Sequence, residues 1–157
     1  MHSQLAIQTP TPQDYPELTQ VWEDSVRATH DFLPQSYIAQ LRELVLTRYL
    51  DAVMLVCCKD HRQRISGFAG ISPGRVEMLF IAPRYRGQGL GKHLLQHAIH
   101  RCNASELDVN EQNTQAVGFY FKQGFEVIGR SEHDGMKQPY PLLHLKLKSA
   151  TNRMLPG

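Results

Sequence analysis

The stretch at residues 86–92 contains the residues whose types and spacing point most clearly to chemistry. Gly87, Gly89 and Gly91 occupy every second position, which removes the Cβ atoms that would hold a ligand away from the backbone. The stretch follows an apolar run and leads into an amphipathic helical pattern. The first N–H groups of such a helix, and the positive end of its dipole, point back into the loop. We therefore expect a pyrophosphate to bind here, as part of a phosphate-bearing cofactor.

Two other glycine-rich motifs fit these residues less well. A Walker A loop needs G-x-x-x-x-G-K-S/T, but Lys92 is followed by His93, and Arg86 stands where the first glycine belongs. A dinucleotide-binding loop needs G-x-G-x-x-G/A, and its third small residue is missing whether the motif begins at Gly87 or at Gly89. The pattern that fits is Q/R-x-x-G-x-G/A, beginning at Arg86.

With this pattern the chain resembles the GNAT superfamily of acetyl-CoA-dependent N-acetyltransferases. Residues 76–91 look like the family's fourth strand and pyrophosphate loop. Asn113 and residues 116–125 look like its N-x-x-A-x-x-F-Y-x-x-x-G-F segment, about one helix and one strand further on. A narrower resemblance, to the YjaB-like branch of small bacterial acetyltransferases, rests on residues 110–113, 129–132 and 139–143.

The elements that must position these motifs are helices and strands in an α/β order. Helical spacing of apolar residues predicts helices after Thr11, across 38–49, at 89–102 and at 115–123. Strands are expected at 5–8, 52–59, 65–71, 75–82, 106–109, 125–129 and 142–147. The resemblance implies the GNAT, or acyl-CoA N-acyltransferase, fold: a mixed twisted sheet of about seven strands flanked by about four helices. We expect one N-acetyltransferase domain over residues 1–148 and a flexible tail at 149–157.

Length and composition exclude several other classes of protein. With 157 residues, 41% of them apolar and 20% charged, the chain suits one globular domain. Its longest apolar run, residues 52–58, is far shorter than the ~20 residues that cross a membrane, and no secretory signal is visible. Three cysteines without a C-x-x-C pair indicate reduced thiols in the cytoplasm. A net charge of +2 without a basic tract argues against nucleic-acid binding.

The resemblance implies acetyl-CoA as the co-substrate and no metal. Backbone N–H groups of the glycine loop would bind the pyrophosphate, and the preceding strand would lend main-chain groups to the pantetheine at a bulge. Asn113 would hydrogen-bond the cofactor, with a helix cap as the alternative. The expected cofactor-binding residues are Leu79, Phe80, Ile81, Arg86, Gly87, Gln88, Gly89, Leu90, Gly91, Lys92, Asn113 and Tyr120.

Catalysis of acetyl transfer to an amine needs a proton donor for the departing thiolate and a base for the amine. Tyr120 is the expected general acid, since its phenol can protonate the thiolate. Glu77, an acid within an otherwise apolar strand, is a candidate base, although strand alternation could simply turn it to solvent. The rival bases are His30, His133, His144 and Tyr140.

We therefore expect an enzyme that acetylates a primary amine of a small molecule or peptide through a ternary complex. A catalytically silent CoA-binding module is the alternative, and a homodimer is a candidate assembly because members of the family are often dimers. His30, His133 and Tyr140 are expected to contact the acceptor, because they lie in two loops, where specificity usually resides. Three further histidines, at 93, 97 and 100, are expected to form a solvated helix face rather than a metal site.

Overall fold

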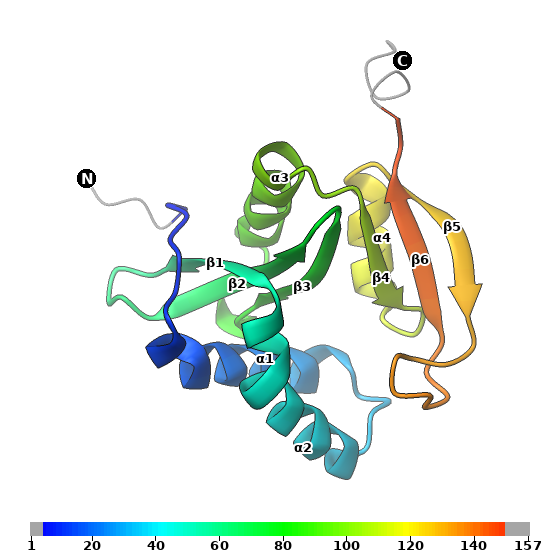
Figure 1. The fold of residues 1–157 in the computed structure, drawn as a ribbon, viewed down its shortest axis with the longest axis horizontal. Coiled ribbons are helices and arrows are strands. Elements are labelled where there is room, and N and C mark those ends of the chain that lie inside the picture. Colours follow the sequence, from blue (N-terminus) through cyan, green and yellow to red (C-terminus); the bar gives the residue numbers. More distant parts are fainter. Residues whose placement is uncertain (1–4, 150–157) are drawn as a thin grey trace. The chain divides into compact units, whose positions relative to one another are not determined.

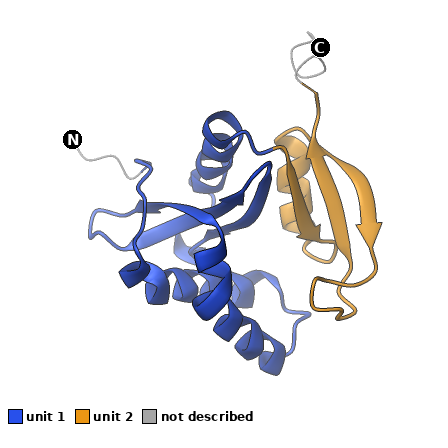
Figure 2. Ribbon diagram, viewed as in Figure 1, with its two compact units in different colours: residues 1–104 blue, residues 105–157 orange. Residues whose placement is uncertain are grey.

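The computed structural model describes residues 5–149, which form two compact units divided after residue 104 (Figures 1 and 2). The described residues contain six strands and four α-helices. Most of the tail expected at 149–157 lies outside them. The strand expected at 5–8 is reduced to a single bridge between Gln8 and Cys57, because Pro10 and Pro12 lack the N–H groups that would extend the ladder.

The first unit begins with two helices that pack through apolar faces. A short 3-10 turn, η1 (Pro12–Asp14), leads into α1 (Tyr15–Thr29), and the Thr11 N–H donates to Asp14 Oδ2 at 2.9 Å. The second helix, expected at 38–49, starts earlier, as α2 (Gln35–Leu44). It continues as a π-helical segment, η2 (Val45–Tyr49), and a 3-10 turn, η3 (Leu50–Ala52). The buried apolar face predicted for α1 is present.

Three antiparallel strands form the centre of the first unit. They are β1 (Met54–Lys59), β2 (Ile65–Ser72) and β3 (Arg75–Ile81), with β2 in the middle. Helices α1 and α3 (Leu90–Cys102) both contact β2 and β3, and they lie on opposite faces of these strands (Figure 1). Burial on both faces explains why nearly every residue of β2 is apolar or small.

The second unit is a three-stranded antiparallel sheet with one helix. Strand β6 (Leu142–Leu147) lies between β4 (Glu106–Asn110) and β5 (Phe125–Ser131). Helix α4 (Thr114–Lys122) contacts β4 and β5. Alternation along the strands buries Leu107, Val109 and Leu145, and it turns the residues between them to the opposite face of the sheet.

Candidate active site

The glycine loop of the first unit forms an open cradle at the start of α3. Gly87 and Gly89 have φ values of 76° and 85°, in the left-handed region that glycine adopts without strain. Gly89 caps α3, and its carbonyl accepts the first helical hydrogen bond, from the His93 N–H, at 3.0 Å. Among residues 5–149, apart from the two chain neighbours, no atom lies within 4 Å of a Cβ placed at Gly87 or Gly89. The space beside the loop backbone is therefore free for a ligand.

The charge and hydrogen-bonding capacity of this loop fit a pyrophosphate. The N–H groups of Leu90, Gly91 and Lys92 precede the first helical hydrogen bond, so the helix itself does not use them. Arg86 and Lys92 are exposed beside them and contribute positive charge. The residues present thus suit the phosphate-bearing part of acetyl-CoA.

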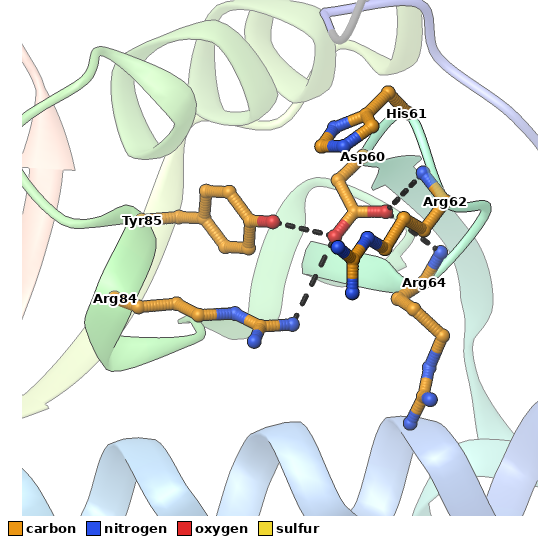
Figure 3. Close-up of a pocket in the computed structure, with 6 residues that line it drawn as sticks. All are labelled: Asp60, His61, Arg62, Arg64, Arg84 and Tyr85. Atoms are coloured by element: carbon orange, nitrogen blue, oxygen red, sulfur yellow. Dashed lines mark hydrogen bonds and ion pairs between the residues drawn. The ribbon is translucent and has the colours of Figure 1, made fainter.

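A short 3-10 turn, η4 (Pro83–Tyr85), connects β3 to the loop, and Asp60 holds it in place (Figure 3). The Asp60 carboxylate is buried and accepts hydrogen bonds from the Tyr85 hydroxyl at 2.5 Å and from the Arg62 and Arg64 N–H groups at 2.8 and 3.0 Å. These bonds, the Tyr85 bond foremost, lower the pKa of Asp60 to about 2. Neither Asp60 nor Tyr85 was among the residues that the sequence pointed to.

The same residues line an open pocket of about 310 Å³ in the first unit. Figure 3 shows Arg84 and Tyr85 on one side of Asp60 and the turn between β1 and β2 on the other. The Arg84 guanidinium lies 5.1 Å from the centre of the Tyr85 ring and 3.8 Å from Asp60. The Asp60 carboxylate in this pocket therefore links η4 to the β1–β2 turn through hydrogen bonds.

Strand β3 contains both the expected pantetheine-binding residues and Glu77. Leu79, Phe80 and Ile81 are partly buried and pair regularly with β2. The register shifts near Glu77 instead, since Met78 faces Gly70 while Val76 faces Ile71. Glu77 is exposed and forms an ion pair with Arg75 at 3.1 Å.

His30 ends α1 in a buried position. Its Nδ1 lies 2.7 Å from Thr29 Oγ1, and its ring lies 5.3 Å from that of Phe32. Burial, followed by the positive charge of Arg86, lowers the pKa of His30 to about 4. His30 is therefore neutral at pH 7, and it lies near enough to the glycine loop for the charge of Arg86 to act on its imidazole.

The second unit contains Asn113 and Tyr120 on α4. Asn113 caps this helix, with its Oδ1 accepting from the Ala116 N–H at 3.3 Å, so the cap considered as an alternative is present. The Tyr120 ring is buried edge-on against Phe119 and Phe125, at 5.2 and 5.9 Å between ring centres. Burial raises the pKa of Tyr120, so its phenol keeps its proton at neutral pH.

The loop between β5 and β6 contains His133 and Tyr140. His133 is exposed and Tyr140 is partly buried. Asp134 organises the loop, because its Oδ1 accepts from the N–H groups of Met136 and Gln138, each at 2.9 Å. His133 and Tyr140 thus lie in a loop whose backbone is held by hydrogen bonds to Asp134.

Sequence reasoning missed one cluster in the second unit. Asp108, His144 and Ser131 lie on three different strands and are joined by hydrogen bonds of 2.6 and 2.7 Å. Only His144 was singled out beforehand, as one of several rival bases. Strand alternation in the sequence indicates that Asp108 and His144 lie on the face of the sheet away from the buried residues. The sequence does not reveal which residues of the strands pair with one another.

The histidines of α3 form a solvated face only in part, because α3 packs against β2 and β3. His100 is exposed and lies 2.7 Å from Gln96 Oε1, whereas His97 is partly buried and burial lowers its pKa. Among the described residues, no group of three or more His, Cys, Asp or Glu side chains could hold a metal ion. None of the helices within residues 5–149 is both long and apolar enough to cross a membrane.

Residues 22–137 match the family described as acetyltransferase (GNAT) domain. The chain is 47% identical over 129 residues to the peptidyl-lysine N-acetyltransferase YjaB of Salmonella typhimurium, a match that covers 82% of this chain and 88% of that protein. The apo form of YjaB from Escherichia coli, solved in solution, has a TM-score of 0.82 and 40% identity over 92% of this chain and 98% of that one.

A more distant structure has the same fold. The PaiA N-acetyltransferase of Thermoplasma acidophilum, in complex with coenzyme A, has a TM-score of 0.67 and 22% identity, covering 90% of this chain and 98% of that one. These matches confirm the fold class predicted from the two motifs, and they also confirm the narrower resemblance.

Proposed function

Since this chain belongs to the GNAT family, and is an acetyl-CoA-dependent N-acetyltransferase, we propose that its acceptor is the side-chain amine of lysine in a peptide or protein. The observation that carries the proposal is the 47% identity, over most of both chains, to a protein named for that activity. This is narrower than the small-molecule or peptide amine that the sequence predicted. We further propose that the enzyme works in the cytoplasm, which its three free cysteines support.

We propose that the glycine loop and β3 of the first unit take part in binding the co-substrate. Acetyl-CoA supplies the thioester from which the acetyl group is transferred. The N–H groups and positive charges of residues 86–92 would hold its pyrophosphate. The main-chain groups of Leu79, Phe80 and Ile81 would bind the pantetheine, and one of their N–H groups would stabilise the developing oxyanion. Asn113, whose Oδ1 caps α4, is proposed to donate a hydrogen bond from its side-chain NH2 to the cofactor.

Tyr120 is the proposed general acid. The Tyr120 phenol is protonated over the whole neutral range, so it is in the form that can donate a proton to the leaving thiolate. His133 and Tyr140 are proposed to contact the acceptor from their loop. His30, being buried and neutral, would shape the acceptor pocket as part of its wall. Both substrates are proposed to bind before transfer, in a ternary complex, with Glu77 as one candidate for the base.

The experiment is acetyl transfer from acetyl-CoA to three probes. They are a peptide with a blocked N-terminus and one lysine, the same peptide with a free N-terminus and arginine in place of lysine, and spermidine. We expect the lysine peptide to gain one acetyl group, detected by mass spectrometry. Tyr120→Phe should lower kcat on this peptide by ~10²–10⁴-fold while leaving CoA affinity in calorimetry nearly unchanged. Transfer to spermidine or to the free N-terminus alone would contradict the lysine assignment.

A further inference from the structure

Three polar side chains in the second unit form one continuous hydrogen-bonded chain. His144, on the central strand β6, has its Nδ1 2.6 Å from Asp108 Oδ1 on β4. Its Nε2 lies 2.7 Å from Ser131 Oγ on β5. Because β6 pairs with both neighbours, a single imidazole bridges the full width of the three-stranded sheet.

The pairing register makes this bridge possible. Asp108 stands directly opposite His144 in the β4–β6 pair, and Gly129 stands opposite it in the β5–β6 pair. A Cβ at Gly129 would already lie 3.4 Å from Cδ2 of His144, so a larger side chain there would press on the ring. The glycine leaves the imidazole room to lie across β5 and reach Ser131.

The partners of the imidazole determine where its proton resides. Nδ1 faces a carboxylate, which accepts and cannot donate when ionised, so Nδ1 carries the proton and donates it to Asp108. Nε2 then has a free lone pair, which accepts the Ser131 O–H. This is the arrangement of an oriented base: a carboxylate fixes the tautomer, and the opposite nitrogen is ready to take a proton.

The cluster lies on the face of the sheet opposite its buried side and is accessible to solvent. About a third of the side chain is exposed for both His144 and Asp108. Lys146, the next residue of β6 on the same face as His144, stands opposite Glu106 on β4 and Glu126 on β5. Among the described strand residues on this face, three carboxylates, those of Asp108, Glu106 and Glu126, stand with one lysine, Lys146. A face of that charge attracts a lysine ammonium.

Ser131 also connects the cluster to the loop proposed to contact the acceptor. It is the last residue of β5, and the loop with His133 and Tyr140 begins directly after it. The end of the hydrogen-bonded chain that can receive a proton therefore lies beside that loop.

We propose that His144 is the base that removes a proton from the acceptor amine, that Ser131 relays this proton, and that Asp108 positions the imidazole. The inference rests on the proposed function, and it assigns to His144 the role for which Glu77 was a candidate. The lysine ammonium donates one proton to Ser131 Oγ while the Ser131 proton moves to Nε2. The neutral nitrogen then bonds to the acetyl carbon as the carbon–sulfur bond breaks. Its second proton leaves to solvent, and Tyr120 protonates the thiolate.

The test is the pH profile of kcat/KM with acetyl-CoA and the single-lysine peptide. For the wild type we expect kcat/KM to rise with pH and then to level off, as in a reaction that needs a base in its unprotonated form. His144→Gln should lose that step and be ~10²–10⁴-fold slower at neutral pH. Its rate should recover only toward pH ~10, where the amine deprotonates unaided. His100→Gln, on the exposed part of α3, is the matched histidine control and should keep the wild-type profile.

Two milder variants separate positioning from folding. Asp108→Asn should lower kcat on the lysine peptide while leaving the peptide KM nearly unchanged, because the imidazole loses the carboxylate that orients it. Ser131→Ala should keep the step at a reduced rate, because water can take the place of the hydroxyl. If His144→Gln fails to fold, these two variants and an NMR spectrum of the wild-type imidazole nitrogens carry the test. The expected tautomer has its proton on Nδ1, and a proton on Nε2 instead would overturn the proposal.

The outcomes separate this proposal from the proposed function. If the wild type acetylates the lysine peptide and His144→Gln keeps the wild-type profile, His144 is not the base, while the lysine assignment stands. The same holds if Glu77→Gln, rather than His144→Gln, abolishes the step. If the wild type transfers nothing to the peptide, the proposed function fails, and the base assignment that rests on it fails as well.

Discussion

Gly89 and Gly74 adopt nearly the same backbone conformation in very different places. Their φ values are 85° and 78°, and in the described part of the chain no atom beyond the adjacent residues lies within 4 Å of a Cβ at either. Alanine at either position should therefore lower the free energy of unfolding by a similar ~1–2 kcal/mol, measurable by urea denaturation. Only Gly89→Ala should also weaken CoA binding in calorimetry, since only Gly89 belongs to the pyrophosphate cradle. If both variants bind CoA with equal affinity, the glycine loop is not part of the CoA-binding site.

At the residue scale, what the sequence predicted depended on whether the signal was local. The glycine cradle, Asn113 and Tyr120 could be located because their motifs lie within a single loop or helix. The contact of His144 with Asp108 and Ser131 could not, because it depends on the register of β6 with two strands far away in the sequence. Likewise, nothing near Tyr85 in the sequence indicates a hydrogen bond to Asp60.

At the scale of elements, η4 determines where the glycine loop begins, and the Tyr85–Asp60 hydrogen bond holds η4. Tyr85→Phe should raise the Kd for CoA severalfold, because the loop loses its anchor while every group that touches the ligand stays. Tyr15→Phe is the matched control: it removes a tyrosine–aspartate hydrogen bond of 3.1 Å, to Asp51, on other elements. Calorimetry at pH 7 checks both. If Tyr15→Phe weakened CoA binding as much as Tyr85→Phe, the proposed role of the Tyr85–Asp60 hydrogen bond in positioning the loop would be wrong.

The elements themselves were predicted closely where one signal dominated. Strand β6 has the predicted bounds, and the bounds of β2, β3 and α3 differ from the prediction by one residue. The prediction failed where two signals compete. The expected helix over 38–49 contains a π-helical segment at Val45–Tyr49, whose wider turns helical spacing alone does not reveal. The strand at 5–8 had β propensity but two prolines directly after it.

At the scale of the whole molecule, the buried neutral His30 makes stability depend on pH. Its pKa of about 4 in the folded protein lies below the ordinary 6.5 of the unfolded chain. The unfolded state therefore takes up the proton first as pH falls, and stability decreases between pH 6.5 and 4. Between pH 7 and pH 5 we expect a loss of about 2 kcal/mol in the free energy of unfolding. Urea denaturation at both pH values measures it.

His30→Gln is the variant that isolates this effect. It should unfold with a weaker pH dependence over the same range, although the partly buried His97, whose pKa is also lowered, keeps part of it. An unchanged slope in His30→Gln would show that other groups are responsible.

The fold class could be predicted from the sequence without knowing any side-chain contact, because the order of the elements and two motifs at the right separation were enough to predict it.

The buried pair of cysteines on β1 has a practical consequence for assays. Cys57 and Cys58 have no exposed surface, and burial raises the pKa of each thiol to about 11. A disulfide reagent that yields a coloured product reacts with thiolates, so these two side chains should remain silent toward it in the native protein. Cys102, which is partly exposed, sets the background at no more than one equivalent per chain. Coenzyme A released on turnover can therefore be followed continuously by absorbance without replacing any cysteine.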